Sequence, residues 1–242
     1  TPKPDAVIIT GDLTENGRPE EYAQFRRLFE NRLSCPVYVG LGNHDRRNNF
    51  RTALAGWPGV TTDPEFVQYT ADIGPLRLIM LDSVVPGAGY GELCPRRIAF
   101  LEQALADSAG KPVIVGLHHP PLLTGIATLD IIPLRQHEVF LSILGRHDNV
   151  ACVLSGHHHR IIHHQRGGAM LLSGPAVGGH QSEITFDPTA PAYFHLEPGG
   201  YFLLRWDETQ GLMAFLTQIG DFPGPFPFTV DPDYPGRPAP QA

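Results

Sequence analysis

Short apolar runs alternate with amphipathic stretches along the first two thirds of the chain. The runs are rich in Leu and β-branched residues, which is typical of strands in a sheet that is buried on both faces. Five strands are predicted, at residues 6–10, 37–40, 76–81, 112–117 and 150–154. The stretches between them predict helices at residues 19–32, 95–105 and 134–144. This alternation predicts an α/β fold.

The pattern changes after Gly156, where strand-like segments punctuated by Gly and Pro replace the helical periodicity. The predicted strands of this half are residues 160–164, 169–172, 201–206 and 212–218. We therefore expect three parts: a core over residues 1–165, a β-rich remainder and cap over 166–221, and a Pro/Gly-rich arm over 222–242.

The amino-acid composition and net charge limit which kinds of protein and partner are expected. Hydrophobic residues make up 42% of the 242 residues and charged residues 18%, which is typical of an ordered domain. The formal net charge is −7 and only two residues are Lys, so no nucleic acid polymer is expected as a partner. The three Cys are far apart and no apolar run is long enough to span a membrane, so we expect free thiols, no membrane contact and a cytoplasmic location.

Four polar clusters follow four of the predicted strands. Carboxyl ends of strands in an α/β sheet converge on one crevice, so these clusters can meet there. They offer a carboxylate, an amide oxygen and several imidazoles, a ligand set that suits Zn, Mn, Fe, Co or Ni better than Ca. The clusters are Thr10-Gly11-Asp12, Gly42-Asn43-His44-Asp45, His118-His119-Pro120-Pro121 and Ser155-Gly156-His157-His158-His159.

Several residues of these clusters have both a possible functional role and a structural alternative. The Asp12 carboxylate can bridge two metal ions, but without the other clusters it would be interpreted as a turn residue. On an extended segment His157 and His159 would point to the same face and His158 away from it, toward the surface or the substrate rim. His44 can contact a substrate oxygen or protonate a leaving group. His119 remains open between a substrate contact and a structural role.

The ordered motifs around Asp12, Asn43, His118 and His157 resemble those of calcineurin-like metallophosphoesterases. They are most similar to the bacterial class III branch of cyclic-nucleotide and glycerophosphodiester phosphodiesterases. The resemblance spans residues 5–164 and includes the tail segment 218–228. It implies a metallophosphoesterase-type αββα sandwich with a β-rich C-terminal segment that caps the site or mediates dimerisation.

The resemblance also implies a role for each matching residue. Asp12 would bridge two metals, with Asn43, His118 and His157 completing one site and His159 binding the other metal. Asp12 and His44 would be catalytic. The expected substrate contacts are Asn43, His44, His119 and, in a Gly-rich loop, His180.

The implied activity is hydrolysis of a small phosphodiester, a cyclic nucleotide or a glycerophosphodiester, by attack of a hydroxide that bridges two divalent ions of Mn, Fe, Co or Zn. A homo-oligomer, dimer or higher, is expected. The alternatives are a phosphomonoesterase or pyrophosphohydrolase of the same superfamily or, if the N-terminal strand of the family is truly absent, a metal-binding pseudoenzyme.

The sequence differs from the family pattern at its N-terminus, where members carry a strand ending in Asp-x-His that supplies two further metal ligands. No Asp in this sequence is followed two residues later by His. We expect such a segment to precede Thr1 in the native protein; otherwise one metal site has been lost.

Overall fold

A six-stranded sheet forms the centre of the computed structural model, which describes residues 3–30, 32–60, 63–166 and 168–227. Its strand order is β3-β4-β5-β6-β8-β7, with the four inner strands parallel and the two edge strands antiparallel to their neighbours. The strands are β3 (Tyr69–Ile73), β4 (Leu76–Met80), β5 (Val113–Gly116), β6 (Val150–Ser155), β7 (Ile162–Arg166) and β8 (Ala169–Ser173).

Alternate residues of the inner strands point to two different hydrophobic cores. Ile79 of β4 and Val153 of β6 pack in the core that holds the apolar side chains of α3 (Pro95–Ala106) and α5 (His137–Leu144). Their neighbours Leu78 and Cys152 pack in the core on the opposite face. The inner strands are therefore buried on both faces, which explains why they read as continuous apolar runs.

Two smaller sheets form a second layer over that opposite face. One is the parallel pair β1 (Val7–Ile9) and β2 (Val37–Val39), and the other is the antiparallel pair β11 (Gly200–Asp207) and β12 (Gly211–Gln218). Helices α1 (Pro19–Phe29) and α2 (Arg47–Ala53) cover the outer face of the β1–β2 pair. The layers follow the order helix, sheet, sheet, helix, so the predicted αββα sandwich is confirmed.

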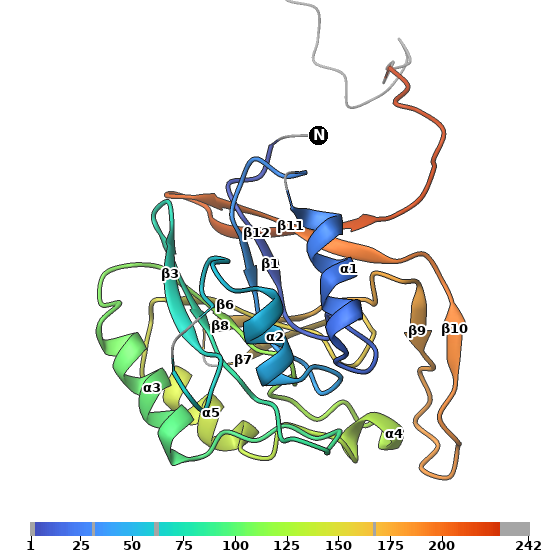
Figure 1. Ribbon diagram of the computed structural model, residues 1–242, viewed down its shortest axis with the longest axis horizontal. Coiled ribbons are helices and arrows are strands. Elements are labelled where there is room, and N and C mark those ends of the chain that lie inside the picture. Colours follow the sequence, from blue (N-terminus) through green and yellow to red (C-terminus); the bar gives the residue numbers. More distant parts are fainter. Residues whose placement is uncertain (1–2, 31, 61–62, 167, 228–242) are drawn as a thin grey trace, which may run out of the picture.

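Five elements were not predicted from the sequence, namely α2, β3, the short helix α4 (Ala127–Asp130), β9 (His180–Ser182) and β10 (Phe194–Leu196). Each is short or lies at an edge, so tertiary contacts rather than periodicity define it. The β9–β10 pair projects as a ribbon from one side of the molecule, and the chain after β12 runs away from the body (Figure 1).

Most of the predicted arm, residues 228–242, lies outside the described residues. Among the helices of the described ranges, none has the length and hydropathy needed to cross a bilayer.

Candidate metal centre

Four loops bring oxygen and nitrogen atoms from distant parts of the chain together. Asp12 follows β1, Asn43 follows β2, His118 follows β5 and His157 follows β6. His118 Nε2 lies 3.2 Å from an Asp12 carboxylate oxygen and 3.1 Å from the Asn43 side-chain oxygen. That same Asn43 oxygen lies 3.0 Å from His157 Nδ1. The four residues predicted to bind one metal ion are therefore adjacent.

Backbone carbonyls fix the tautomers of the two imidazoles. His118 Nδ1 lies 3.0 Å from the Thr10 carbonyl oxygen, and His157 Nε2 lies 3.1 Å from that of Ile132. Because a carbonyl oxygen only accepts hydrogen bonds, these two nitrogens carry the protons of the neutral rings. The opposite nitrogen of each ring then turns its lone pair toward Asn43.

The electrostatics of this cluster favour a bound cation. Burial lowers the pKa of His157 to about 2, and the neighbouring His118 acts in the same direction. Burial acts to raise the pKa of Asp12, but the charge and hydrogen bond of His118 outweigh it and hold that pKa below its usual range. His118 Nε2, His157 Nδ1, the Asn43 side-chain oxygen and an Asp12 carboxylate oxygen thus converge, each 3.0–3.2 Å from the next. Such a donor set fits a divalent transition metal.

The loops that carry the predicted metal ligands, called the ligand loops below, adopt backbone conformations that residues other than glycine rarely take. Asp12, His157 and His159 are the non-glycine residues with positive φ in the described part of the chain, at 53°, 66° and 48°. Such conformations cost about 1–3 kcal/mol each and cluster at functional sites. The prediction of an extended segment at 157–159 is therefore wrong, because two left-handed residues bend it.

Asp45 ties the first two ligand loops together. Its buried carboxylate accepts hydrogen bonds from the backbone N–H groups of Leu13 and Gly42 at 3.2 and 2.9 Å. It also accepts hydrogen bonds from the hydroxyls of Thr14 and Tyr22, at 3.0 and 2.9 Å. One side chain thus fixes the loop that carries Asp12 against the loop that carries Asn43.

These two loops also touch through glycines. A Cβ atom on Gly42 would lie 2.0 Å from an Asp12 carboxylate oxygen, and one on Gly11 would lie 2.5 Å from the Gly42 nitrogen. Only glycine permits this approach.

His44 lies on the exposed side of the cluster. Its backbone N–H donates to Asp12 at 3.1 Å, and its Nδ1 lies 2.8 Å from the Glu15 carbonyl oxygen. Partial burial acts to lower its pKa, but this hydrogen bond and the negative charges of Asp12 and Glu15 raise the pKa overall. The Nε2 atom of this ring is left available to a ligand.

His159 and His180 form a second pair of rings. Their centroids lie 4.4 Å apart, and His159 interacts electrostatically with Asp12, His118 and His44. Burial, and then His180, lower the pKa of His159 to about 4. The structure therefore places His159 near the cluster and His180 against His159.

His158 does not face the surface or the substrate rim, and that prediction is wrong. Its side chain is buried and neither ring nitrogen has a hydrogen-bond partner among the described residues. The bend at His157 turns this side chain inward.

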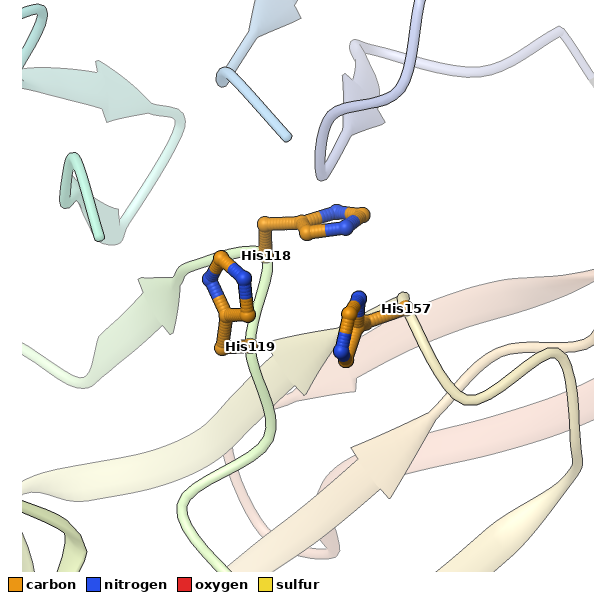
Figure 2. Close-up of side chains that lie close together, drawn as sticks. All are labelled: His118, His119 and His157. Atoms are coloured by element: carbon orange, nitrogen blue, oxygen red, sulfur yellow. The ribbon is translucent and has the colours of Figure 1, made fainter. Parts of the chain in front are cut away.

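His119 is fully buried behind the ligands. Its donor atoms lie within 4.8 Å of those of His118 and His157, and Figure 2 shows the three rings close together. However, His119 Nδ1 lies 2.8 Å from the Ser83 hydroxyl and its Nε2 lies 3.2 Å from the Gly89 carbonyl oxygen. Both nitrogens thus have protein partners, and the ring ties the loop after β5 to the loop after β4. Sequence reasoning did not single out Ser83, which no motif marks.

Comparisons with known proteins agree with this geometry. The chain is 35% identical over 228 residues to the probable glycerophosphodiester phosphodiesterase GpdQ of Arcobacter nitrofigilis, covering 94% of this chain and 82% of that protein. It is 32% identical to the 3',5'-cyclic adenosine monophosphate phosphodiesterase CpdA of Pseudomonas aeruginosa, covering 79% of this chain and 69% of that protein.

A solved structure has the same fold. The dimetal phosphatase from Danio rerio superposes with a TM-score of 0.58 at 16% identity, over 72% of this chain and 73% of that one. The sequence profile of the calcineurin-like phosphoesterases matches residues 1–160. The resemblance seen in the motifs is thereby confirmed, and the chain belongs to the calcineurin-like phosphoesterase family.

Proposed function

We propose that this protein is a metal-dependent phosphodiesterase that hydrolyses a small phosphodiester, either a cyclic nucleotide or a glycerophosphodiester. The observation that carries the proposal is the convergence of oxygen and nitrogen atoms from Asp12, Asn43, His118 and His157. The names of relatives that align over most of this chain, a glycerophosphodiester and a cyclic nucleotide phosphodiesterase, support the substrate class.

The residues of the cluster divide into ligands and a proton donor. Asp12, Asn43, His118 and His157 would hold one divalent ion, and His159 with the shared Asp12 would belong to a second. Bound ions of Mn, Fe, Co or Zn would supply positive charge for the phosphoryl oxygens and lower the pKa of water. His44, with its raised pKa and its free Nε2, is suited to donate a proton to the leaving alkoxide.

A diester substrate is favoured by the pairing of two arginines that lie close in sequence to residues of the site. Arg47 pairs with Asp82 at 2.7 Å, Arg160 pairs with Glu197 at 2.9 Å, and both acidic partners compensate their charge. A dianionic monoester would lack these counter-ions, whereas a singly charged diester needs fewer of them.

The test compares specificity constants for an aryl phosphodiester and the matching monoester, with the protein loaded in turn with Mn, Fe, Co and Zn. We expect the diester to be preferred. A monoester preference above about tenfold, or ~1.4 kcal/mol of transition-state binding, would overturn the proposal in favour of a phosphomonoesterase. Metal binding without turnover of any phosphate ester would identify a pseudoenzyme.

We also propose a cytoplasmic homo-oligomer. The three cysteines are unpaired, which supports a reducing compartment. Exposed apolar side chains gather on the chain around and after the β9–β10 ribbon, and such surfaces are typical of protein interfaces. They include Val177, Ile184, Ile219, Phe222 and Phe226. Light scattering on the purified protein measures the oligomeric state, and a monomer at micromolar concentration would contradict this proposal.

A further inference from the structure

We propose that Phe194 is a specificity-determining residue that binds a planar aromatic part of the substrate, such as a nucleobase or an aryl group. This inference rests on the proposed function and concerns the same site. It is drawn from the β9–β10 ribbon, which sequence reasoning did not predict and which the catalytic roles above do not use.

The pairing of the ribbon puts Phe194 on the same face as His180. In the antiparallel pair, Leu196 lies opposite His180 and Phe194 lies opposite Ser182. Residues directly opposite each other share a face, so these four side chains form one surface. Gln181 and His195 point to the other face.

A row of rings leads from the metal cluster to Phe194. The His159 and His180 centroids lie 4.4 Å apart with their planes at 89°, and those of His180 and Phe194 lie 6.3 Å apart at 88°. Both are edge-to-face contacts, which orient each ring relative to the next. Phe194 is therefore joined to the predicted ligand His159 through one intervening ring, that of His180.

The ribbon is fixed to the ligand loop, so the position of Phe194 is set relative to His159. The Ser182 N–H donates to the His159 carbonyl oxygen at 3.2 Å. Arg160, the next residue, donates to the Ser182 carbonyl oxygen and forms a two-pronged pair with Glu197 at 2.9 Å. These bonds hold both strands of the ribbon against the segment that carries His159.

Phe194 itself is 66% exposed, and its neighbour Leu196 is 85% exposed. Apart from the Ser182 hydroxyl and the His180 ring, the face offers apolar surface. Such a surface favours a flat aromatic group, because stacking of a base on an aromatic side chain contributes about 1–3 kcal/mol. A glycerol group has no ring with which to make that contact.

The experiment measures KM and kcat of metal-loaded Phe194→Ala for a 3',5'-cyclic nucleotide and for glycerophosphoethanolamine. We expect KM for the cyclic nucleotide to rise at least fivefold, while KM for glycerophosphoethanolamine and both kcat values stay within twofold. Phe194→Trp should keep the wild-type KM. The matched control is Phe186→Ala, which removes a similarly exposed ring that lies over Gly125, outside the row.

Calorimetric titration of a nucleoside 5'-monophosphate provides a second readout that needs no turnover. Weaker binding to Phe194→Ala than to Phe186→Ala supports the inference even if the wild type hydrolyses no diester, a result that would refute only the proposed function. The inference is overturned if KM rises equally for both substrates. It is also overturned if the two Ala variants behave alike, or if Phe194→Ala changes the oligomeric state instead of nucleotide binding.

Discussion

The ligand loops and the β9–β10 ribbon differ in how far their side chains are buried and hydrogen-bonded. In the loops after β1 and β2, Asp45 is buried and its carboxylate accepts four hydrogen bonds. In the ribbon, Phe194 and Leu196 are largely exposed. Hydrogen bonds within the fold hold these loops in fixed positions, which is what groups of an active site require. The ribbon leaves apolar surface free for a partner or substrate, so it can change selectivity without disturbing the chemistry.

The sharpest test of the loop region separates His44 from Asn43. We expect His44→Ala to lower kcat by about 10²–10⁴-fold, chiefly for poor leaving groups, because the variant lacks a proton donor. Its metal content should equal that of the wild type, since no assigned ligand is changed. Asn43→Ala should lose metal instead, as measured by atomic emission after dialysis. Equal metal loss in the two variants would identify His44 as a ligand.

Two phenylalanines compare the packing beneath the loops with that of the ribbon side. Phe50 of α2 is fully buried against the β1–β2 pair, whereas Phe186 is 71% exposed. We expect Phe50→Ala to reduce the free energy of unfolding by about 3–5 kcal/mol. Phe186→Ala should change it by less than about 0.5 kcal/mol. Urea denaturation measures both, and similar losses would show that the Phe186 ring is packed in solution and not exposed.

Asp45→Asn tests the four hydrogen bonds by which the Asp45 carboxylate joins the loop of Asp12 to the loop of Asn43; this link is called the clamp below. An amide cannot accept from all four donors, so the loops that carry Asp12 and Asn43 should shift apart. We expect metal affinity to fall about 10–100-fold, the usual effect of losing a group that orients ligands. Asp72→Asn is the control, because Asp72 is an exposed partner of Lys111. Metal affinity that is unchanged in Asp45→Asn would show that the clamp does not position the ligands.

The smallest expected effect is a pH dependence of stability from Tyr69. Burial raises the pKa of this phenol, which donates to the Val39 carbonyl oxygen at 2.9 Å. The unfolded chain therefore releases the proton first, at about pH 10, and stability falls above that pH by about 1 kcal/mol per pH unit. Tyr69→Phe should flatten the fall, whereas Tyr193→Phe, exposed beside the ribbon, should not. Denaturation midpoints between pH 9 and 11 check this, and parallel slopes for all three proteins would contradict it.

Much of the fold and of the metal cluster could be predicted from the sequence, because both follow from local pattern. Strands β4, β5 and β6 are buried on both faces, so their apolar runs identify them without any knowledge of the partners. Each polar motif directly follows a strand, so its position at the carboxyl end was predictable as well. These two observations were sufficient to predict that Asp12, Asn43 and His118 converge.

Tertiary structure alone decided how those residues are held. The backbone carbonyl groups of Thr10 and Ile132 set the imidazole tautomers, and the Ser83 hydroxyl hydrogen-bonds to His119. No motif marks Ile132 or Ser83, and Thr10 contributes a backbone group that any residue would supply. The left-handed backbone at His157 and His159 accompanies a buried His158, which the sequence predicted to face outward. The ribbon escaped prediction because its strands are short and exposed, so apolar periodicity carries no signal there. Contacts between residues far apart in the chain select these features, and no local pattern encodes them.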